Sequence, residues 1–180
     1  MRPLTEDETK KLFAKLAKYI GGNTKHLLER SDEKWVFRLH NSRIWYMPHR
    51  LMQAASSIAK KNLAGIGVMF AKVTHNEHIR IQITALEYLA QYALFKVWVK
   101  PNQEQAFMYG AHISRSGLGR ITENTPQYQG VAVFSMSDIP MGFGVTAQST
   151  LQCRKCEMNT NVLFHEGDIG EYLRNEAKLT

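Results

Sequence analysis

Cys153 and Cys156 stand three residues apart, a spacing typical of half a structural zinc site or of a redox-active pair. A structural zinc ion needs two further ligands, but the chain has no third cysteine, and His165 is the only histidine close downstream. A redox pair needs a strand-to-helix setting, whereas we expect this pair in a turn between strands. The pattern favours reduced, structural cysteines over metal or redox chemistry, and no cofactor is expected.

Other catalytic patterns are equally weak. His75 and His78 flank an expected hairpin turn with Glu77 as the one carboxylate beside them, which makes a poor metal site. The chain contains no Gly-x-Ser-x-Gly nucleophile elbow. Three further carboxylates stand alone in the sequence, with no partner for general acid–base work nearby: Asp32, Asp138 and Asp168. We therefore expect a protein without catalytic residues.

Two pairs of glycines invite a nucleotide-binding interpretation, Gly65 with Gly67 and Gly142 with Gly144. Neither pair has the spacing of a dinucleotide-binding or Walker loop. We expect the first pair inside a strand, where glycine marks a bulge or close packing. We expect the second pair to shape a turn, so no nucleotide site is predicted.

Positive charge is the stronger signal. The chain has 23 Lys plus Arg against 16 Asp plus Glu, a net charge of +7, which favours an anionic partner such as nucleic acid. Arg115 and Arg120 lie in a loop of small residues, and Arg154 and Lys155 lie on the expected turn between the cysteines. Arginine presents a fork and lysine a point charge to phosphates, so these four side chains are candidate RNA-binding residues.

The aromatic residues expected near these cations have two possible roles. Tyr109, Tyr128 and Phe143 offer stacking faces for RNA bases, or they belong to the core, where large aromatic residues are often buried. The same ambiguity holds for four lysines of the expected first helix, which form a solvated face or contact RNA: Lys10, Lys11, Lys15 and Lys18.

The first half of the chain mixes helices with hairpin-linked strands, an α+β layout. Thr5 and Glu8 form a capping box that opens a helix, and Gly21-Gly22-Asn23 ends it. Periodicity then predicts strands, helices and turns in this order: a hairpin of 34–39 with 43–47, a helix from Pro48 to Lys60, a hairpin of 66–73 with 79–84, and a helix over 86–93.

The pattern changes at Phe95, where short strands separated by turn signals predict a small barrel or sandwich. The expected strands cover 96–100, 106–109, 131–136, 145–149 and 162–164, and a short helix covers 167–177. We therefore place the domain boundary between residues 94 and 95, with domains of residues 1–94 and 95–180. No linker or internal repeat separates the two halves.

Composition excludes other classes of protein. The hydrophobic content of 44% over 180 residues is that of a folded chain. The longest apolar run, Leu63–Ala71, is too short to cross a membrane, and the acidic N-terminus is unlike a signal peptide. Two closely spaced cysteines cannot build a disulfide framework, so we expect a reducing, intracellular compartment.

Four segments of the second half together resemble a PUA domain: Gln105–Ile113, Gly130–Ser135, Pro140–Val145 and Gly167–Arg174. They are most similar to the PUA domain of the Nip-seven (nuclear import protein seven) family of large-ribosomal-subunit biogenesis factors. The opening residues and the Lys34–Leu39 strand fit the same family, so the resemblance covers essentially the whole chain and points to a eukaryotic member.

The resemblance implies an N-terminal α/β domain with a mostly antiparallel sheet and a C-terminal PUA pseudo-barrel. It implies a non-catalytic RNA-binding factor for pre-rRNA processing and large-subunit assembly, located in the nucleus and nucleolus. The implied partners are pre-rRNA, pre-ribosomal particles and other assembly factors; we expect a monomer with no membrane partner.

The resemblance also directs attention to the end of the PUA domain. In archaeal relatives, basic residues near this end contact RNA, but the corresponding stretch here, Met158–Phe164, contains no Lys or Arg. Asn161, within this stretch, is the fifth candidate RNA-binding residue.

Three functions remain to be compared. An RNA-binding assembly factor fits the net charge and the loop arginines. A protein-docking adaptor in pre-ribosomal particles, with little direct RNA binding, fits the uncharged Met158–Phe164 stretch. An RNA-modifying enzyme needs a catalytic domain larger than the first ninety-four residues and fits least.

Overall fold

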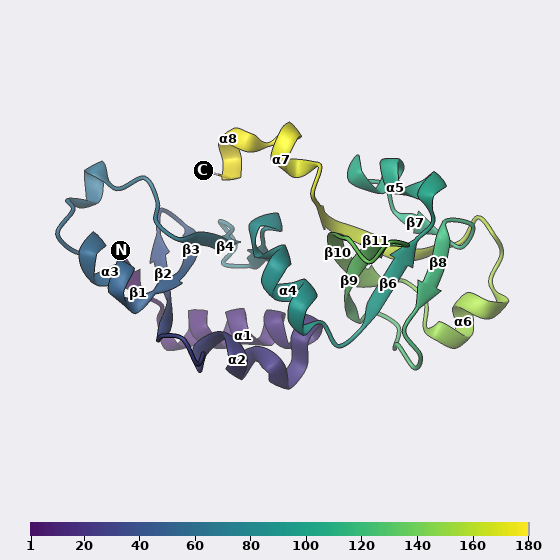
Figure 1. Ribbon diagram of the computed structural model, residues 1–180, viewed down its shortest axis with the longest axis horizontal. Coiled ribbons are helices and arrows are strands. Elements are labelled where there is room, and N and C mark those ends of the chain that lie inside the picture. Colours follow the sequence, from purple (N-terminus) through teal and green to yellow (C-terminus); the bar gives the residue numbers. More distant parts are fainter. Residues whose placement is uncertain (180) are drawn as a thin grey trace. The chain divides into compact units, whose positions relative to one another are not determined.

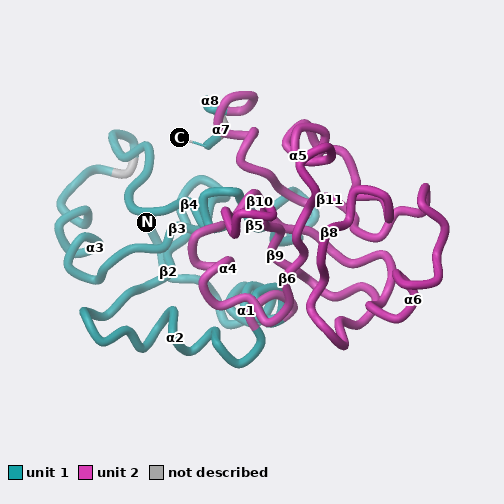
Figure 2. Tube along the Cα trace, turned by 45° about the vertical axis from the view of Figure 1, so that its right-hand side comes forward, with its two compact units in different colours: residues 1–17, 21–85, 176–180 teal, residues 18–20, 86–175 magenta. Residues whose placement is uncertain are grey.

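The computed structural model describes residues 1–179, with all of their side chains except those of Lys60 and Lys178. The chain forms two compact units (Figure 2). Unit 1 contains residues 1–17, 21–85 and the chain from Glu176 onward, and unit 2 contains residues 18–20 and 86–175. Each unit combines helices with its own sheet, so the predicted α+β class is confirmed. The domain boundary at residue 95 stays a prediction.

Unit 1 is built on a five-stranded antiparallel sheet in the order β1-β2-β3-β4-β5 (Figure 1). Rings of Phe37, Tyr46 and Phe70 pack against one another on one face of this sheet. The strands are β1 (Arg2–Pro3), β2 (Trp35–His40), β3 (Arg43–Pro48), β4 (Val68–Val73) and β5 (Ile79–Ile81). The helices are most of α1 (Glu6–Ile20), α2 (Lys25–Leu28), α3 (His49–Ala55) and α8 (Glu176–Leu179), with 3-10 turns η1 (Gly21–Thr24), η2 (Lys60–Asn62) and η3 (Ile83–Ala85).

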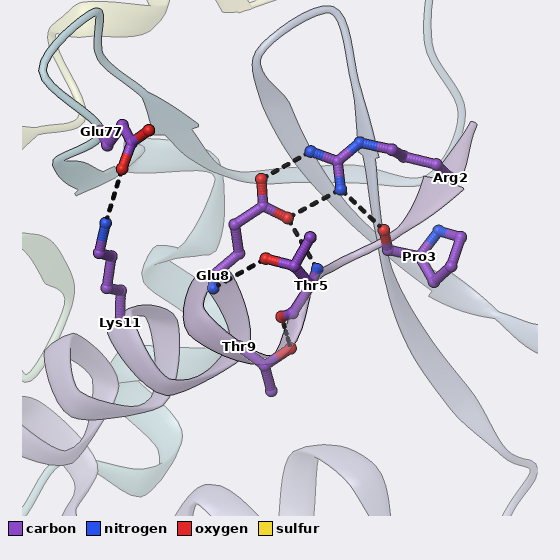
Figure 3. Close-up of polar contacts among 7 residues, drawn as sticks. All are labelled: Arg2, Pro3, Thr5, Glu8, Thr9, Lys11 and Glu77. Carbon is purple, nitrogen blue, oxygen red and sulfur yellow. Dashed lines mark hydrogen bonds and ion pairs between the residues drawn. The ribbon is translucent and has the colours of Figure 1, made fainter.

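The predicted capping box at the start of α1 is present. The Thr5 hydroxyl accepts a hydrogen bond from the Glu8 amide, and the Thr5 amide donates to the Glu8 carboxylate at 2.8 Å. The Arg2 guanidinium donates to both oxygens of the same carboxylate at 2.6 and 2.8 Å (Figure 3). The hydrogen bond from Arg2 is the main reason why the pKa of Glu8 falls to about 2.

The predicted hairpin of β2 with β3 is also confirmed. Asn41 and Ser42, its two turn residues, both have positive φ angles of 49° and 59°. Positive φ at both central positions is the geometry of a type I′ turn, whose twist matches that of the flanking strands.

The helix expected from Pro48 to Lys60 is shorter in the structure, because α3 ends at Ala55. The hydroxyl of Ser56 donates to the carbonyl of Gln53, and that of Ser57 donates to the carbonyl of Ala54. Serine side chains that bond to nearby carbonyls in this way compete with the helical pattern and end the helix.

Unit 2 is built on a six-stranded sheet in the order β7-β11-β10-β9-β6-β8, in which only β6 and β9 pair in parallel among the described strands. The strands are β6 (Lys96–Val99), β7 (Ile113–Ser114), β8 (Leu118–Ile121), β9 (Gly130–Ser135), β10 (Pro140–Thr146) and β11 (Asn161–Asp168). The helices are α4 (Leu86–Tyr92), α5 (Pro101–Met108), α6 (Thr150–Lys155) and α7 (Glu171–Arg174). The core includes Val97, Val99, Phe107, Val131 and Leu163.

Several local predictions for unit 2 were wrong. Residues 106–108 form the end of helix α5 rather than a strand, and Tyr109 follows the helix, because Pro101 starts a helix that buries Phe107 in the core. Strand β10 ends at Thr146, so it does not reach Ser149. The helix expected over 167–177 is two short helices, α7 and α8, since Gly167 and Asp168 still belong to β11.

The glycines predicted to shape a turn, Gly142 and Gly144, instead lie inside strand β10. A Cβ atom at Gly142 would come within 2.2 Å of the Gly167 carbonyl oxygen, and one at Gly144 within 2.3 Å of the Phe164 carbonyl oxygen. Glycine is therefore required here by the close approach of β11, not by a turn.

Candidate nucleic-acid interface

Three of the predicted RNA-binding residues meet at one hollow in unit 2. Arg115, Arg120 and Arg154 line a cavity of about 220 Å³. They come from the β7–β8 turn, from strand β8 and from helix α6. The remaining lining residues are Leu118, Gly119, Ile121, Thr150 and Cys153. We call this group the arginine cavity.

Arg115 is held by its backbone. Its amide donates to the Thr160 carbonyl at 2.8 Å, and the next amide, of Ser116, donates to the Met158 carbonyl at 3.0 Å. The Lys100 amide and ammonium donate to the carbonyls of Gly117 and Ser116. Hydrogen bonds to the segment before β11 and to Lys100 therefore fix the backbone of this turn, which carries Arg115 at the cavity.

Arg120 is held by an aromatic ring. It lies in strand β8 opposite Trp98 of β6, and its guanidinium carbon is 4.4 Å from the centroid of the indole. The indole N–H in turn donates to the Asp138 carboxylate at 2.6 Å. A guanidinium stacked on an indole keeps its edge free for hydrogen bonds, so this contact orients Arg120 while leaving its donors available.

Trp98 was not among the sequence candidates. The strict alternation of residues 96–100 places it on the face opposite the buried Val97 and Val99. This alternation was the available signal, but it does not reveal that Arg120 pairs with this position.

Arg154 and Lys155 lie in the last turn of α6, so the prediction that Cys153 and Cys156 sit in a turn between strands was wrong. A capping box of Ser149 and Gln152 starts this helix. Such a box is a sequence signal for a helix start that the cysteine spacing obscured.

The start of α6 is tied to the loop before β9. The Thr150 hydroxyl donates to the Thr122 carbonyl and accepts from the Thr125 amide. Lys155 and Asn161 do not line the arginine cavity, although both side chains are exposed. The structure thus brings together three of the five candidate residues.

Three arginines and no carboxylate are among the residues that line the cavity. Within residues 1–179, none of Arg115, Arg120 and Arg154 forms an ion pair with a carboxylate. Burial raises the pKa of the Cys153 thiol, with Arg115 opposing the shift, so this cysteine stays a neutral wall of the cavity. Both cysteines are free thiols.

The three aromatic residues that were candidates for base stacking differ in burial. Phe143 is 1% exposed and packs edge-on against Tyr19, so it is a core residue. Tyr109 and Tyr128 are exposed, and the guanidinium of Arg174 lies 5.7 Å from the Tyr109 ring. Neither exposed tyrosine lines the arginine cavity.

Two family models match the chain. The pre-PUA domain of NIP7/UPF0113 matches residues 1–83, and the UPF0113 PUA domain matches residues 95–177. The chain is 56% identical to the "60S ribosome subunit biogenesis protein NIP7 homolog" of Tetraodon nigroviridis and 55% identical to that of Xenopus tropicalis, each over 100% of both chains. The chain belongs to the NIP7 family. The resemblance to the Nip-seven family is therefore confirmed, together with the PUA fold of the second half.

Solved structures agree with the fold of this NIP7-family chain. A PUA domain from Aeropyrum pernix K1, crystallised as a tartrate complex, has a TM-score of 0.63 at 15% identity and covers 99% of this chain and 90% of its own. A conserved PUA domain protein from Thermoplasma acidophilum has a TM-score of 0.56 at 12% identity, covering 96% and 95%. At these identities the likeness shows the fold alone.

A second polar cluster in the NIP7-family fold is structural. The fully buried carboxylate of Asp168 accepts from His165 at 2.6 Å and from Arg174 at 2.9 and 3.1 Å. The sequence predicted Asp168 to be isolated, but its partners lie only three and six residues away, His165 on the same strand β11 and Arg174 on α7. The guanidinium of Arg174 stabilises the buried carboxylate and joins β11 to α7.

In the described part of the chain, no three His, Cys, Asp or Glu side chains are grouped so that they could hold a metal ion. Every helix within residues 1–179 is too short or too polar to span a lipid bilayer.

Proposed function

We propose that the chain is a non-catalytic RNA-binding factor in the assembly of the large ribosomal subunit, and that the arginine cavity binds the RNA backbone. The observation that carries this proposal is that Arg115, Arg120 and Arg154 all line one cavity and that, within residues 1–179, none of them forms an ion pair with a carboxylate. Membership in a family named for 60S subunit biogenesis supports the cellular role.

The size of the cavity favours a phosphodiester over a larger ligand. Its volume of about 220 Å³ is below the roughly 300–1,000 Å³ of sites that enclose a drug-sized molecule. Guanidinium groups bind phosphate oxygens through paired, charge-assisted hydrogen bonds. The arrangement therefore suits one or two backbone phosphates of a strand that continues outside the cavity, and it positions RNA without making or breaking a bond.

The wider role follows from the same proposal. The partners are pre-rRNA, pre-ribosomal particles and other assembly factors, and the site of action is the nucleus and nucleolus. We further propose that residues 1–94 and 95–180 are the two functional domains, with Lys155 and Asn161 as outlying contacts of the second. The protein would act as a monomer.

A protein-docking adaptor is the second candidate function. The surface of α6 and of the segment that leads from it to β11 favours it, because Leu151 and Met158 are 67% and 64% exposed. The Met158–Phe164 stretch adds no positive charge. Exposed apolar side chains with little charge are typical of protein contacts rather than phosphate contacts.

The test separates the two functions. The double variant Arg115→Glu with Arg120→Glu should lose crosslinks to pre-rRNA in cells while assembly factors still co-purify with it. The matched control, Lys25→Glu with Lys34→Glu, reverses two exposed cations of unit 1 and should keep the crosslinks. Loss of the protein partners with intact RNA crosslinks would instead favour the docking adaptor.

A further inference from the structure

A row of cations crosses the sheet of unit 1. The strand register places Arg43 of β3 directly opposite Lys72 of β4, and Lys72 directly opposite Arg80 of β5. Residues that pair across strands share a face of the sheet, so the three side chains leave the sheet on the same side. Arg38 of β2 shares this face, because it is two residues from His40, which pairs with Arg43. We call Arg43, Lys72 and Arg80 the cation row.

The row has no acidic counterpart in its own sheet. The five strands contain no Asp or Glu, although they contain five Lys or Arg residues. Two other cations of unit 1 do form ion pairs, Arg2 with Glu8 and Lys11 with Glu77 (Figure 3). Lys72 and Arg80 are exposed, and within residues 1–179 neither forms an ion pair.

Such a row opposes folding. Like charges directly opposite each other on neighbouring strands repel, since their Cβ atoms are about 5 Å apart. A single carboxylate at the central position would relieve the repulsion from both sides. Lys72 at this position adds repulsion and, within residues 1–179, forms no ion pair, which points to a polyanion outside the fold.

We propose that the cation row is a second RNA-binding surface that contacts the phosphate backbone of a single strand. Neighbouring strands lie about 4.8 Å apart, so the row spans roughly 10 Å, with Lys72 and Arg80 as its exposed charges beside the half-buried Arg43. This inference rests on the proposed function only in naming RNA as the polyanion, because no residue of the arginine cavity takes part.

The surroundings of the row fit a phosphate backbone better than an acidic protein. Protein interfaces are centred on buried apolar anchors, whereas phosphate contacts need charge alone. The apolar residues on the same face, including Trp45 and Met69, are already buried in the core. The exposed large hydrophobic residues in the described part of unit 1 all lie outside the five strands: Leu28, Leu51 and Ile58.

The experiment uses the full-length protein and a fluorescently labelled single-stranded oligouridine. Fluorescence anisotropy gives the dissociation constant at a series of KCl concentrations for the wild type and for Lys72→Ala with Arg80→Ala. For single strands, each lost phosphate contact lowers the slope of log affinity against log salt by about 0.7, or about 5-fold in affinity at ~0.1 M salt. The double variant should therefore bind about 25-fold more weakly.

Two controls accompany this variant. Lys25→Ala with Lys34→Ala removes two exposed charges of unit 1 from outside the row and should keep the wild-type slope within the error of the fit. Lys72→Arg with Arg80→Lys keeps the charge of the row and should also bind as the wild type does. A thermal melt of each variant confirms that it is folded.

The outcomes are distinct. If Lys72→Ala with Arg80→Ala keeps the wild-type slope while Arg115→Glu with Arg120→Glu weakens binding, this inference is overturned and the proposed function stands. If Lys72→Ala with Arg80→Ala weakens binding while Arg115→Glu with Arg120→Glu does not, the cation row is supported and the arginine cavity is not an RNA-binding site. If RNA binding is unchanged but poly-glutamate binds the wild type and not the row variant, the row takes an acidic protein segment and the RNA assignment is wrong.

Discussion

At the scale of single residues, the candidate site depends on how its arginines are held. Arg120 is stacked on Trp98, and Trp98 is fixed by Asp138 through its indole N–H. An exposed arginine without such support samples many rotamers and loses that freedom on binding, at a cost of up to about 2 kcal/mol. The ring removes part of this cost before RNA arrives.

Replacing Trp98 with alanine should therefore weaken RNA binding without removing any charge. A cation–π contact at an exposed site contributes roughly 0.5–1 kcal/mol, which corresponds to about 2- to 5-fold in the dissociation constant. Trp98→Phe keeps a ring but loses the hydrogen bond to Asp138, and it should recover most of the affinity. Anisotropy with oligouridine measures both. An alanine variant that binds as tightly as the wild type would show that the stacking does not prepare Arg120.

Glu8 gives a second prediction at this scale. Its pKa falls from the ordinary value of 4.5 to about 2, mainly because of the hydrogen bond from Arg2. A depressed carboxyl pKa stabilises the fold fully above pH 4.5, and this stabilisation is lost as the pH falls toward 2. Urea unfolding at a series of pH values should show this loss, and Glu8→Gln should show less of it. An equal loss in both proteins would contradict the assignment.

At the scale of elements, most of unit 1 could be predicted, because its signals are local. The capping box of Thr5 and Glu8 and the turn at Asn41 and Ser42 lie within a few residues of the structure that they produce. Unit 2 was harder. Phe107 has strand propensity but is buried by a helix that starts at Pro101, and the capping box at Ser149 was overlooked beside the cysteines.

The candidate site could be predicted only in part for the same reason. The residue types of Arg115, Arg120 and Arg154 suggested phosphate binding, and the structure brings all three together. Their meeting depends on the pairing of β6 with β8 and on the attachment of α6 to the Thr122 carbonyl. These long-range contacts leave no pattern in a single sequence, so neither the cavity nor the cation row was predicted.

The cation row gives the prediction that belongs to elements. Lys72→Glu places a carboxylate between Arg43 and Arg80 and turns two repulsive cross-strand pairs into attractive ones. Opposite-charge pairs contribute roughly 0.2–1 kcal/mol each, so the free energy of unfolding should rise by about 1 kcal/mol. RNA affinity should fall in the same variant. Urea denaturation and anisotropy measure the two effects, and a variant that is less stable would show that the row is compensated within the fold.

At the scale of the whole molecule, the proposed recognition of RNA depends on charge. The two proposed surfaces, one in each unit, would both contact phosphates. A protein of this kind should bind many single strands with similar affinity, because phosphate contacts position a strand without reading its bases. Sequence preference in an assembling subunit would then come from RNA shape and from protein partners.

The central claim is that Arg115, Arg120 and Arg154 bind the RNA backbone together, and the salt dependence of binding tests it most directly. Single-stranded oligouridine is titrated against the full-length wild type and against the triple alanine variant over a range of KCl concentrations. Three lost phosphate contacts should lower the slope of log affinity against log salt by about 2. An unchanged slope in a folded triple variant would contradict the account.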